Sequence, residues 1–278
     1  MNEAVTGRDA ALAALAASGV HVTTAALADI SRHGPELYRK LREREPCVVI
    51  VEAPDVESLD VMALRWMFKG GVTPLVLCPA SAAECAELAT TAAKAATLLR
   101  VPAFLLLEDD VAEEELAGPP PSDFPALRFE HPAPQDQIDQ PEDDAEVREL
   151  DALLSSPPLG FDATRLDRHP RGSGRPEWLV VSYGAASRAA GEAVARAREQ
   201  GQRVDLLRTR LLWPLPEAEL LRATAGIKHV VVAERNLGQY AQEVRRMLPG
   251  LPVIVAGGVG KLASETVMRR LARSPRCC

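Results

Sequence analysis

The second half of the chain alternates between short apolar runs and segments whose apolar residues recur at helical spacing. The apolar runs predict strands at 178–182, 204–207, 228–233 and 252–256. The segments between and after them predict helices at 187–199, 214–223, 240–248 and 264–272. Strands that alternate with helices form right-handed βαβ units. Strands that are apolar on both sides belong to parallel sheets with both faces covered, so we expect such a sheet here.

The first half shows the same pattern less completely. Its apolar runs predict strands at 47–51, 74–77 and 103–107. Helical spacing and alanine-rich stretches predict helices at 9–18, 59–68 and 81–99. The expected fold class is therefore α/β, with two parallel-sheet domains.

The middle of the chain differs from both halves. A stretch rich in Pro, Asp, Glu and Gln follows Gly118, and a second loose stretch contains Pro-Pro and Arg-Gly-Ser-Gly-Arg. Such composition buries too little apolar area to order itself, although a short helix is expected at 145–154. We therefore divide the chain into a first domain (1–116), an acidic, Pro-rich linker (117–175) and a second domain (176–278).

Charge and composition exclude several classes of protein. The chain has 278 residues and a net charge of -7, but residues 108–149 alone carry 15 acidic and 2 basic residues. An isoelectric point near 5.4 and the lack of a basic stripe argue against nucleic-acid binding. No apolar run approaches the ~20 residues that span a bilayer. The N-terminus lacks a basic leader, and the five cysteines form no C-x-x-C, so we expect a cytoplasmic protein without a metal site.

Two strand-to-helix turns of the second domain carry the candidate chemistry, because ligands of parallel sheets collect outside the carboxyl ends of strands. The first turn runs from Tyr183 to Arg188, where small residues allow close approach and a helix N-terminus favours an anion. The second runs from Glu234 to Gln239 and gathers a carboxylate, a guanidinium and two amides. Each turn also has a simpler interpretation: a tight turn with an N-cap for the first, capping plus a salt bridge for the second. The alternative is a polar surface that faces a cofactor or a second subunit.

Three better-known functional motifs are incomplete or absent in this sequence. The Gly-rich stretch 257–261 is similar to a phosphate-binding loop, but it lacks the first glycine and the Ser or Thr after Lys261. The G-x-G-x-x-G and G-x-S-x-G patterns are absent. None of the five histidines has an evident Ser or Cys partner, so we assign no catalytic residue.

The two turns and the segment between them resemble the second domain of alpha subunits of 2-oxoacid:ferredoxin oxidoreductases. That domain carries "YGS-x-x-R", "L-W-P-x-P" and "E-x-N-x-GQ" segments, which match Tyr183–Arg188, Leu212–Pro216 and Glu234–Gln239 in the same order. The first domain also resembles that family, in the opening alanine-rich helix and in residues 60–66 and 75–109. The resemblance implies a thiamine-diphosphate-binding-like pyrimidine domain followed by a transketolase C-terminal-like domain.

The first domain departs from the family in a segment on which the catalysis of the family depends. Thiamine chemistry needs a carboxylate hydrogen-bonded to the aminopyrimidine, and the family supplies it between the opening helix and the "P-C-V-V" strand. Here about two dozen residues separate Thr23 from Cys47, and no such segment is recognisable. Glu43, Glu45 and Glu52 are the possible substitutes.

The resemblance implies an alpha-type subunit of a complex that oxidatively decarboxylates a 2-oxoacid, such as pyruvate, to an acyl-CoA and reduces ferredoxin. A beta-type subunit would hold thiamine diphosphate with Mg, and iron–sulfur clusters would lie only on partner chains. The alternatives are a non-catalytic structural or regulatory subunit, and half of a non-oxidative 2-oxoacid decarboxylase. The residues expected to line a partner or cofactor crevice are Tyr183, Gly184, Ser187, Arg188, Glu234, Arg235, Asn236, Gly238 and Gln239. This expectation requires an open face beside Asn236.

Overall fold

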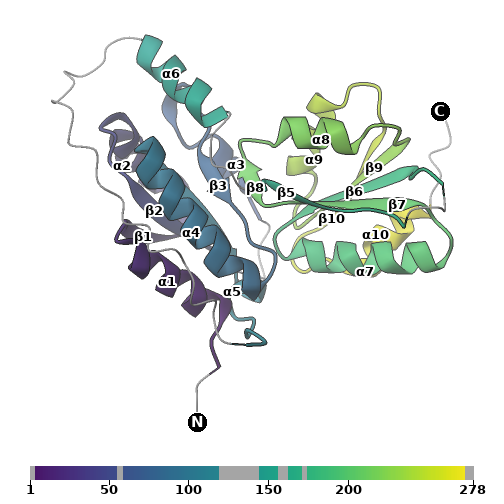
Figure 1. Ribbon diagram of the computed structural model, residues 1–278. Helices are drawn as coiled ribbons and strands as arrows, with labels where there is room; N and C mark the ends of the chain where they lie inside the picture. The colour runs from purple at the N-terminus through teal and green to yellow at the C-terminus, as the bar shows by residue number, and fades with distance from the viewer. Residues whose placement is uncertain (1–3, 55–58, 119–143, 156–161, 171–173, 273–278) are drawn as a thin grey trace.

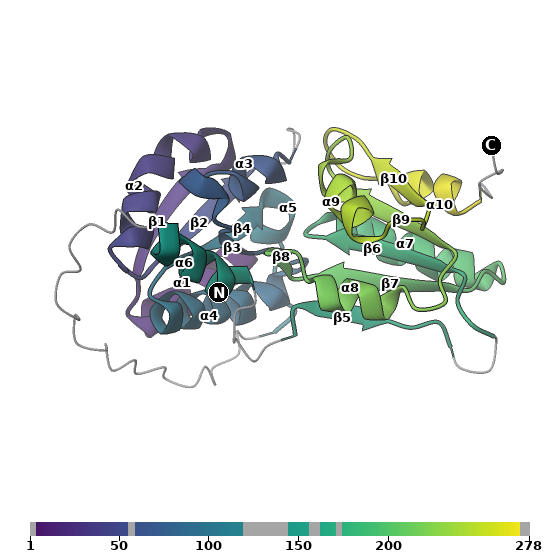
Figure 2. The ribbon, with the colours of Figure 1, turned by 90° about the horizontal axis from the view of Figure 1, so that it is seen from above.

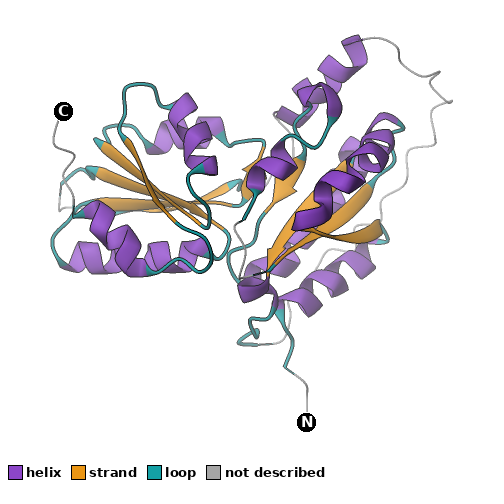
Figure 3. Cartoon of the chain, turned by 180° about the vertical axis from the view of Figure 1, so that it is seen from behind, coloured by secondary structure: helices purple, strands orange, loops and turns teal. Residues whose placement is uncertain are grey.

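The computed structural model describes residues 4–54, 59–118, 144–155, 162–170 and 174–272. Two α/β units lie side by side, each built on a five-stranded, mostly parallel sheet (Figure 1). Helices cover both faces of each sheet (Figure 3). The predicted α/β class is confirmed. Within the described ranges, no helix is long and apolar enough to cross a membrane.

The first sheet has the strand order β1–β2–β4–β3–β8. Its strands are β1 (His21–Ala26), β2 (Cys47–Ala53), β3 (Leu75–Leu77), β4 (Pro102–Glu108) and β8 (Leu211–Trp213). The first four are parallel, and β8 pairs antiparallel with β3. Strand β4 is buried along its whole length, as expected for a central parallel strand with helices on both faces.

Helices pack on both faces of this first sheet (Figure 2). One face carries α1 (Gly7–Ser18) and α4 (Ala82–Leu99), and the other carries α2 (Ile30–Arg42) and α3 (Val61–Arg65). Small residues bring α1 close to its neighbours: a Cβ on Gly7 would lie 2.4 Å from the carbonyl oxygen of Val111 in α5 (Asp109–Ala112). The predicted helix at 59–68 is shorter in the structure and ends at Arg65.

The second sheet has the strand order β10–β9–β6–β7–β5. Its strands are β5 (Thr164–Asp167), β6 (Trp178–Tyr183), β7 (Val204–Thr209), β9 (His229–Glu234) and β10 (Val253–Gly257). All pair in parallel except β5, which runs antiparallel to β7. Helices α7 (Ala186–Glu199) and α10 (Ser264–Leu271) cover one face, and α8 (Glu217–Ala223) and α9 (Gln239–Met247) cover the other (Figure 1).

Three elements depart from the sequence-based division of the chain. Strand β8 belongs to the second half of the sequence but completes the first sheet. Strand β5 and helix α6 (Asp144–Ser155) lie in the segment interpreted as a linker, although the short helix itself was predicted. Leu150 and Leu154 of α6 are buried, and Asp151 accepts a hydrogen bond from the Thr73 amide at 3.1 Å. These two elements therefore extend the domains into the segment between them.

Candidate functional site

Carboxyl ends of strands from both sheets meet at the junction of the two domains. Glu108 ends β4, Tyr183 ends β6 and Glu234 ends β9. Strands β6 and β9 are neighbours, yet the chain leaves β6 toward β7 and only later returns to form β9 on the other side. This is the point in an open parallel sheet where a crevice normally forms and ligands bind. In this chain, the first domain packs against this point of the second sheet.

A buried ion pair occupies the centre of the junction. The Arg235 guanidinium donates to Glu108 Oε2 at 2.7 Å, and the Ala185 amide donates to Glu108 Oε1 at 2.8 Å. Glu108 is 0% exposed and Arg235 is 2% exposed. Burial raises the pKa of Glu108 above its ordinary value, and the adjacent Arg235 charge opposes the rise. Both carboxylate oxygens are therefore engaged by the second domain.

Gly184 lets this carboxylate reach the start of α7. Its φ is +52°, in the left-handed region, and a Cβ built on it would lie 1.8 Å from Glu108 Oε1. Any side chain would displace the carboxylate or the turn. The glycine of the "YG" motif thus serves the contact between the domains.

Asn236 joins the second turn to the first domain. Its amide nitrogen donates to the Tyr183 hydroxyl at 3.0 Å and to the Leu59 carbonyl at 3.2 Å. Its oxygen accepts from the amides of Gly238 and Gln239, both at 2.9 Å, which closes an Asx turn ahead of α9. Asn236 is 1% exposed, so all its hydrogen bonds lie within the chain's interior.

Gln239 extends the same contact toward α3. Its side-chain nitrogen donates to Asp60 at 3.0 Å, and its oxygen accepts from the Val61 amide at 3.1 Å. The Val61 carbonyl in turn accepts from the Trp213 indole at 3.0 Å, where β8 crosses into the first sheet. The second turn and the L-W-P segment therefore bind the same short helix of the first domain.

Glu234 caps the helix that follows it. Its carboxylate accepts from the amides of Tyr240 at 2.9 Å and Ala241 at 3.2 Å. A negative charge at a helix N-terminus is favourable. Burial nevertheless outweighs these hydrogen bonds and raises the pKa of Glu234 to about 7.

Of the remaining predicted residues, Ser187 and Gly238 are buried and Arg188 is exposed. Ser187 is buried and accepts a hydrogen bond from Ser182 at 3.1 Å. Arg188 is 53% exposed and pairs with Glu114 of the first domain at 3.1 Å. Gly238 has a φ of +111° and is the N-cap residue of α9.

The structure thus brings the nine predicted residues into one region, and the contacts described there lie within the chain. The simpler interpretations account for them: Glu234 caps α9, and Arg235 forms a salt bridge. A role in a partner or cofactor crevice stays a prediction. The second turn keeps one open side, because Leu237 is 79% exposed, and Val259 in the neighbouring turn is 62% exposed.

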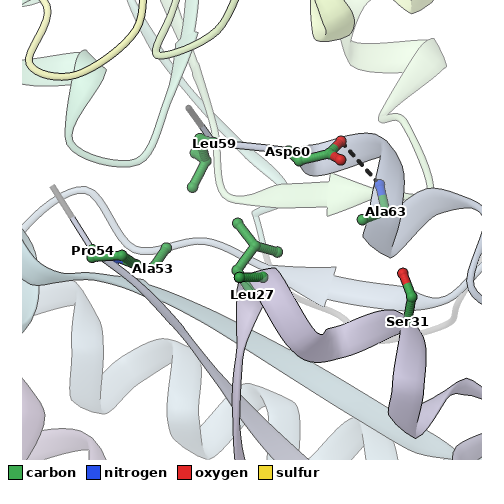
Figure 4. Close-up of a pocket in the computed structure, with 8 residues that line it drawn as sticks. Leu27, Ser31, Ala53, Pro54, Leu59, Asp60 and Ala63 are labelled. Carbon is green, nitrogen blue, oxygen red and sulfur yellow. Dashed lines mark hydrogen bonds between the residues drawn. The ribbon is translucent and has the colours of Figure 1, made fainter. Parts of the chain in front are cut away.

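A small cavity of about 220 Å³ lies beside the junction, at the carboxyl ends of β1 and β2 (Figure 4). Its lining residues are Leu27, Ala28, Ser31, Ala53, Pro54, Leu59, Asp60 and Ala63. Among the described lining residues, Asp60 is the charged one, and it already accepts from the Ala63 amide at 3.2 Å, as the dashed line in Figure 4 marks. In the part of the chain that the structure describes, no group of three His, Cys, Asp or Glu could hold a metal ion.

The three possible substitutes for a thiamine-activating glutamate lie at two places, and none lines the cavity. Glu43 and Glu45 precede β2, at the opposite edge of the sheet from this cavity, and both pair with Arg39. Glu52 lies near the carboxyl end of β2 and pairs with Arg8 of α1. Their positions and pairings place none of them against the cavity.

Sequence analysis missed Glu108, whose carboxylate binds both turns of the second domain. A usable signal was present: the buried strand at 103–107 ends directly in three acidic residues, 108–110. A carboxylate at the end of a buried parallel strand is costly unless it has a partner. Strand β8 was also missed, because its apolar run is only three residues long and is separated from β7 by a single residue.

Comparisons with known proteins agree with the resemblance. Residues 176–268 match the family described as pyruvate:ferredoxin oxidoreductase core domain II. The chain is 30% identical over 231 residues to a 2-oxoglutarate synthase subunit KorA of Methanothermobacter thermautotrophicus, covering 69% of this chain and 60% of that relative. It is 25% identical over 248 residues to a 2-oxoglutarate oxidoreductase subunit KorA of Mycobacterium tuberculosis, covering 75% of this chain and 38% of the relative. The chain thus spans less than two thirds of the length of each of these relatives.

Solved structures share the fold. A 2-oxoglutarate:ferredoxin oxidoreductase from Magnetococcus marinus superposes with a TM-score of 0.74 at 15% identity, over 96% of this chain and 55% of that one. A split-gene transketolase in an inactive beta4 tetramer gives a TM-score of 0.55 at 15% identity, over 95% of this chain and 80% of that one. The resemblance predicted from the motifs is confirmed: the chain is related to the KorA-type alpha subunits of 2-oxoacid:ferredoxin oxidoreductases, and its second half carries domain II of that family.

Proposed function

We propose that the chain is an alpha-type subunit of a thiamine-diphosphate-dependent 2-oxoacid:ferredoxin oxidoreductase-like complex. The reaction of that complex is oxidative decarboxylation of a 2-oxoacid to an acyl-CoA, with reduction of ferredoxin. The observation that carries the proposal is the junction itself. All three domain II motifs of the family contribute to it, and each contacts the first domain of this chain.

The cofactors of this complex are assigned to other chains. A beta-type subunit would hold thiamine diphosphate with Mg, and ferredoxin would receive electrons through iron–sulfur clusters on partner chains. Cys47, Cys78 and Cys85 are free and buried. Burial raises the pKa of Cys47 to about 11 and that of Cys85 to about 12, whereas cluster ligation needs thiolates. The described cysteines therefore do not suit an iron–sulfur site.

The described residues also do not fit the aminopyrimidine of thiamine diphosphate. That ring needs a carboxylate free to accept its hydrogen bond. The buried carboxylates among the described residues are Glu108, Asp205 and Glu234. Glu108 is bound by Arg235 and Ala185, Glu234 by the start of α9, and Asp205 by the His169 amide. This observation favours a second candidate function, a structural or regulatory subunit of such a complex that does not itself activate the cofactor.

One experiment tests both candidates. The tagged full-length chain is isolated from its own cells under native conditions, and co-purifying chains and thiamine diphosphate are identified by mass spectrometry. The complex is then assayed for CoA-dependent reduction of ferredoxin with pyruvate and with 2-oxoglutarate. Turnover by a thiamine-containing complex that stops when this chain is removed supports the first candidate.

The remaining outcomes separate the alternatives. Turnover that persists without this chain, or a thiamine-containing complex without turnover, supports a structural or regulatory subunit. The absence of any thiamine-binding partner contradicts both candidates.

A further inference from the structure

Glu108 belongs to the first domain by sequence, but its described hydrogen bonds are to the second. Its two oxygens meet the Ala185 amide, at the start of α7, and the Arg235 guanidinium, after β9. A helix N-terminus beside a buried guanidinium is a strong environment for a carboxylate, since both supply charge-assisted donors. A site of this kind would normally bind an anion from solution. Here the Glu108 side chain of the same molecule occupies it.

We propose that Glu108 is a built-in carboxylate ligand of the second domain and that it locks the two domains into one folding unit. This inference concerns the chain alone. It holds whether or not the chain joins an oxidoreductase complex.

Comparison with the other contacts across the junction explains why this carboxylate is expected to hold the two domains together. The Arg188–Glu114 and Lys261–Asp110 ion pairs, at 3.1 and 2.5 Å, involve largely exposed cations, and exposed pairs contribute little to stability. Strand β8 joins the first sheet by a short, irregular pairing at its edge. Buried hydrogen bonds from Asn236 to the Leu59 carbonyl and from the Trp213 indole to the Val61 carbonyl also cross the junction, but they join neutral groups. Among the ion pairs between the described residues of the two domains, Glu108–Arg235 is the one buried on both sides, and breaking such a pair leaves an uncompensated buried charge.

A cavity lies beside the Glu108–Arg235 ion pair and is lined by Arg235 itself. It has a volume of about 300 Å³, and its lining includes Ala185, Arg235, Asp110 and Lys261. Replacing Glu108 by alanine would remove the carboxylate next to this cavity. A formate or acetate ion from solution could then bind the same amide and guanidinium, as a free carboxylate in place of the tethered one.

Chemical rescue of the full-length chain tests the proposal. We expect Glu108→Ala to lower the melting temperature by roughly 10 °C and to split one calorimetric transition into two, because the domains no longer unfold together. Sodium formate should raise the melting temperature of this variant and merge the transitions, compared with sodium chloride at the same ionic strength. Formate should have no such effect on the wild type.

A matched control and a second variant keep the test decisive. Lys261→Ala removes an exposed ion pair at the same cavity, so it should melt within a few degrees of the wild type and ignore formate. If Glu108→Ala does not fold, Glu108→Gln keeps the volume, and amide hydrogen exchange should then rise at the start of α7 and after β9. The proposal is overturned if Glu108→Ala melts like the wild type, if formate acts no differently from chloride, or if Glu108→Gln leaves exchange unchanged.

Discussion

The turns after parallel strands differ sharply between the two domains. In the second domain, the turns after β6 and β9 hold buried polar residues whose hydrogen bonds are satisfied within the chain. In the first domain, the described residues that follow β1 and β2 are mostly apolar, and they line a small cavity at the carboxyl ends of these strands. The family's recognisable motifs are therefore kept where they hold the domains together. On the proposed function, the first-domain region expected to contact the aminopyrimidine is the one in which no such family motif is recognisable.

The largest effect on this difference between the domains is expected from substitution of Arg235. Arg235→Ala leaves the Glu108 carboxylate buried and unpaired, and we expect a loss of about 3–5 kcal/mol in the free energy of unfolding. Urea denaturation followed by circular dichroism measures it. The double variant Glu108→Gln/Arg235→Met should recover much of the loss, since it leaves no buried charge. A double variant no more stable than Arg235→Ala would contradict this account.

A pH titration sharpens the role of Glu234. Its pKa is raised from 4.5 to about 7 by burial, so the folded state holds the proton more tightly than the unfolded state. Its contribution to stability is therefore complete below pH 4.5 and is lost as the pH rises toward 7, by on the order of 3 kcal/mol. The unfolding free energy of the wild type minus that of Glu234→Gln should fall over this range. A difference that rises or stays flat would reverse the sign of the assigned pKa shift.

Gly184 tests the close approach of the two domains. We expect Gly184→Ala to cost about 1–3 kcal/mol, because its Cβ would overlap Glu108 Oε1 and its φ is positive. Gly191→Ala in α7 is the matched control, since the nearest atom to its Cβ would be 4.0 Å away. That change should stabilise the helix by up to about 1 kcal/mol. Equal effects of the two substitutions in thermal unfolding would argue against the close approach.

Substitutions of Asn236 and Leu237 compare the buried side and the exposed side of the same turn. Asn236→Ala removes four hydrogen bonds, and we expect it to cost about 1–3 kcal/mol in chemical denaturation. Leu237→Ala should change stability by less than about 0.5 kcal/mol, because the side chain is 79% exposed. If the proposed complex uses this face, Leu237→Ala should instead weaken co-purification of the thiamine-binding partner. Unchanged co-purification would place the partner elsewhere.

Much of the second domain was predictable because its signals are local. Apolar runs such as Trp178–Tyr183 and the helix between Ala186 and Glu199 are set by the spacing of apolar residues over one or two turns. The first domain was less predictable. Strand β1 is a half-exposed edge strand, and helix α2 has Pro35 in its first half, which argues against a helix, so neither element was predicted.

The sequence by itself determined the α/β class, the elements of the second domain, the positions of its two polar turns and the family that they resemble. Only the tertiary structure decided that Glu108 is the anion beside Arg235, that β8 joins the other sheet and that Asn236 faces the first domain. The physical reason is that spacing along the chain reports burial and local geometry. The partner of a buried charge depends on how two folded units dock, and residues 108 and 235 lie at the ends of strands in two different sheets.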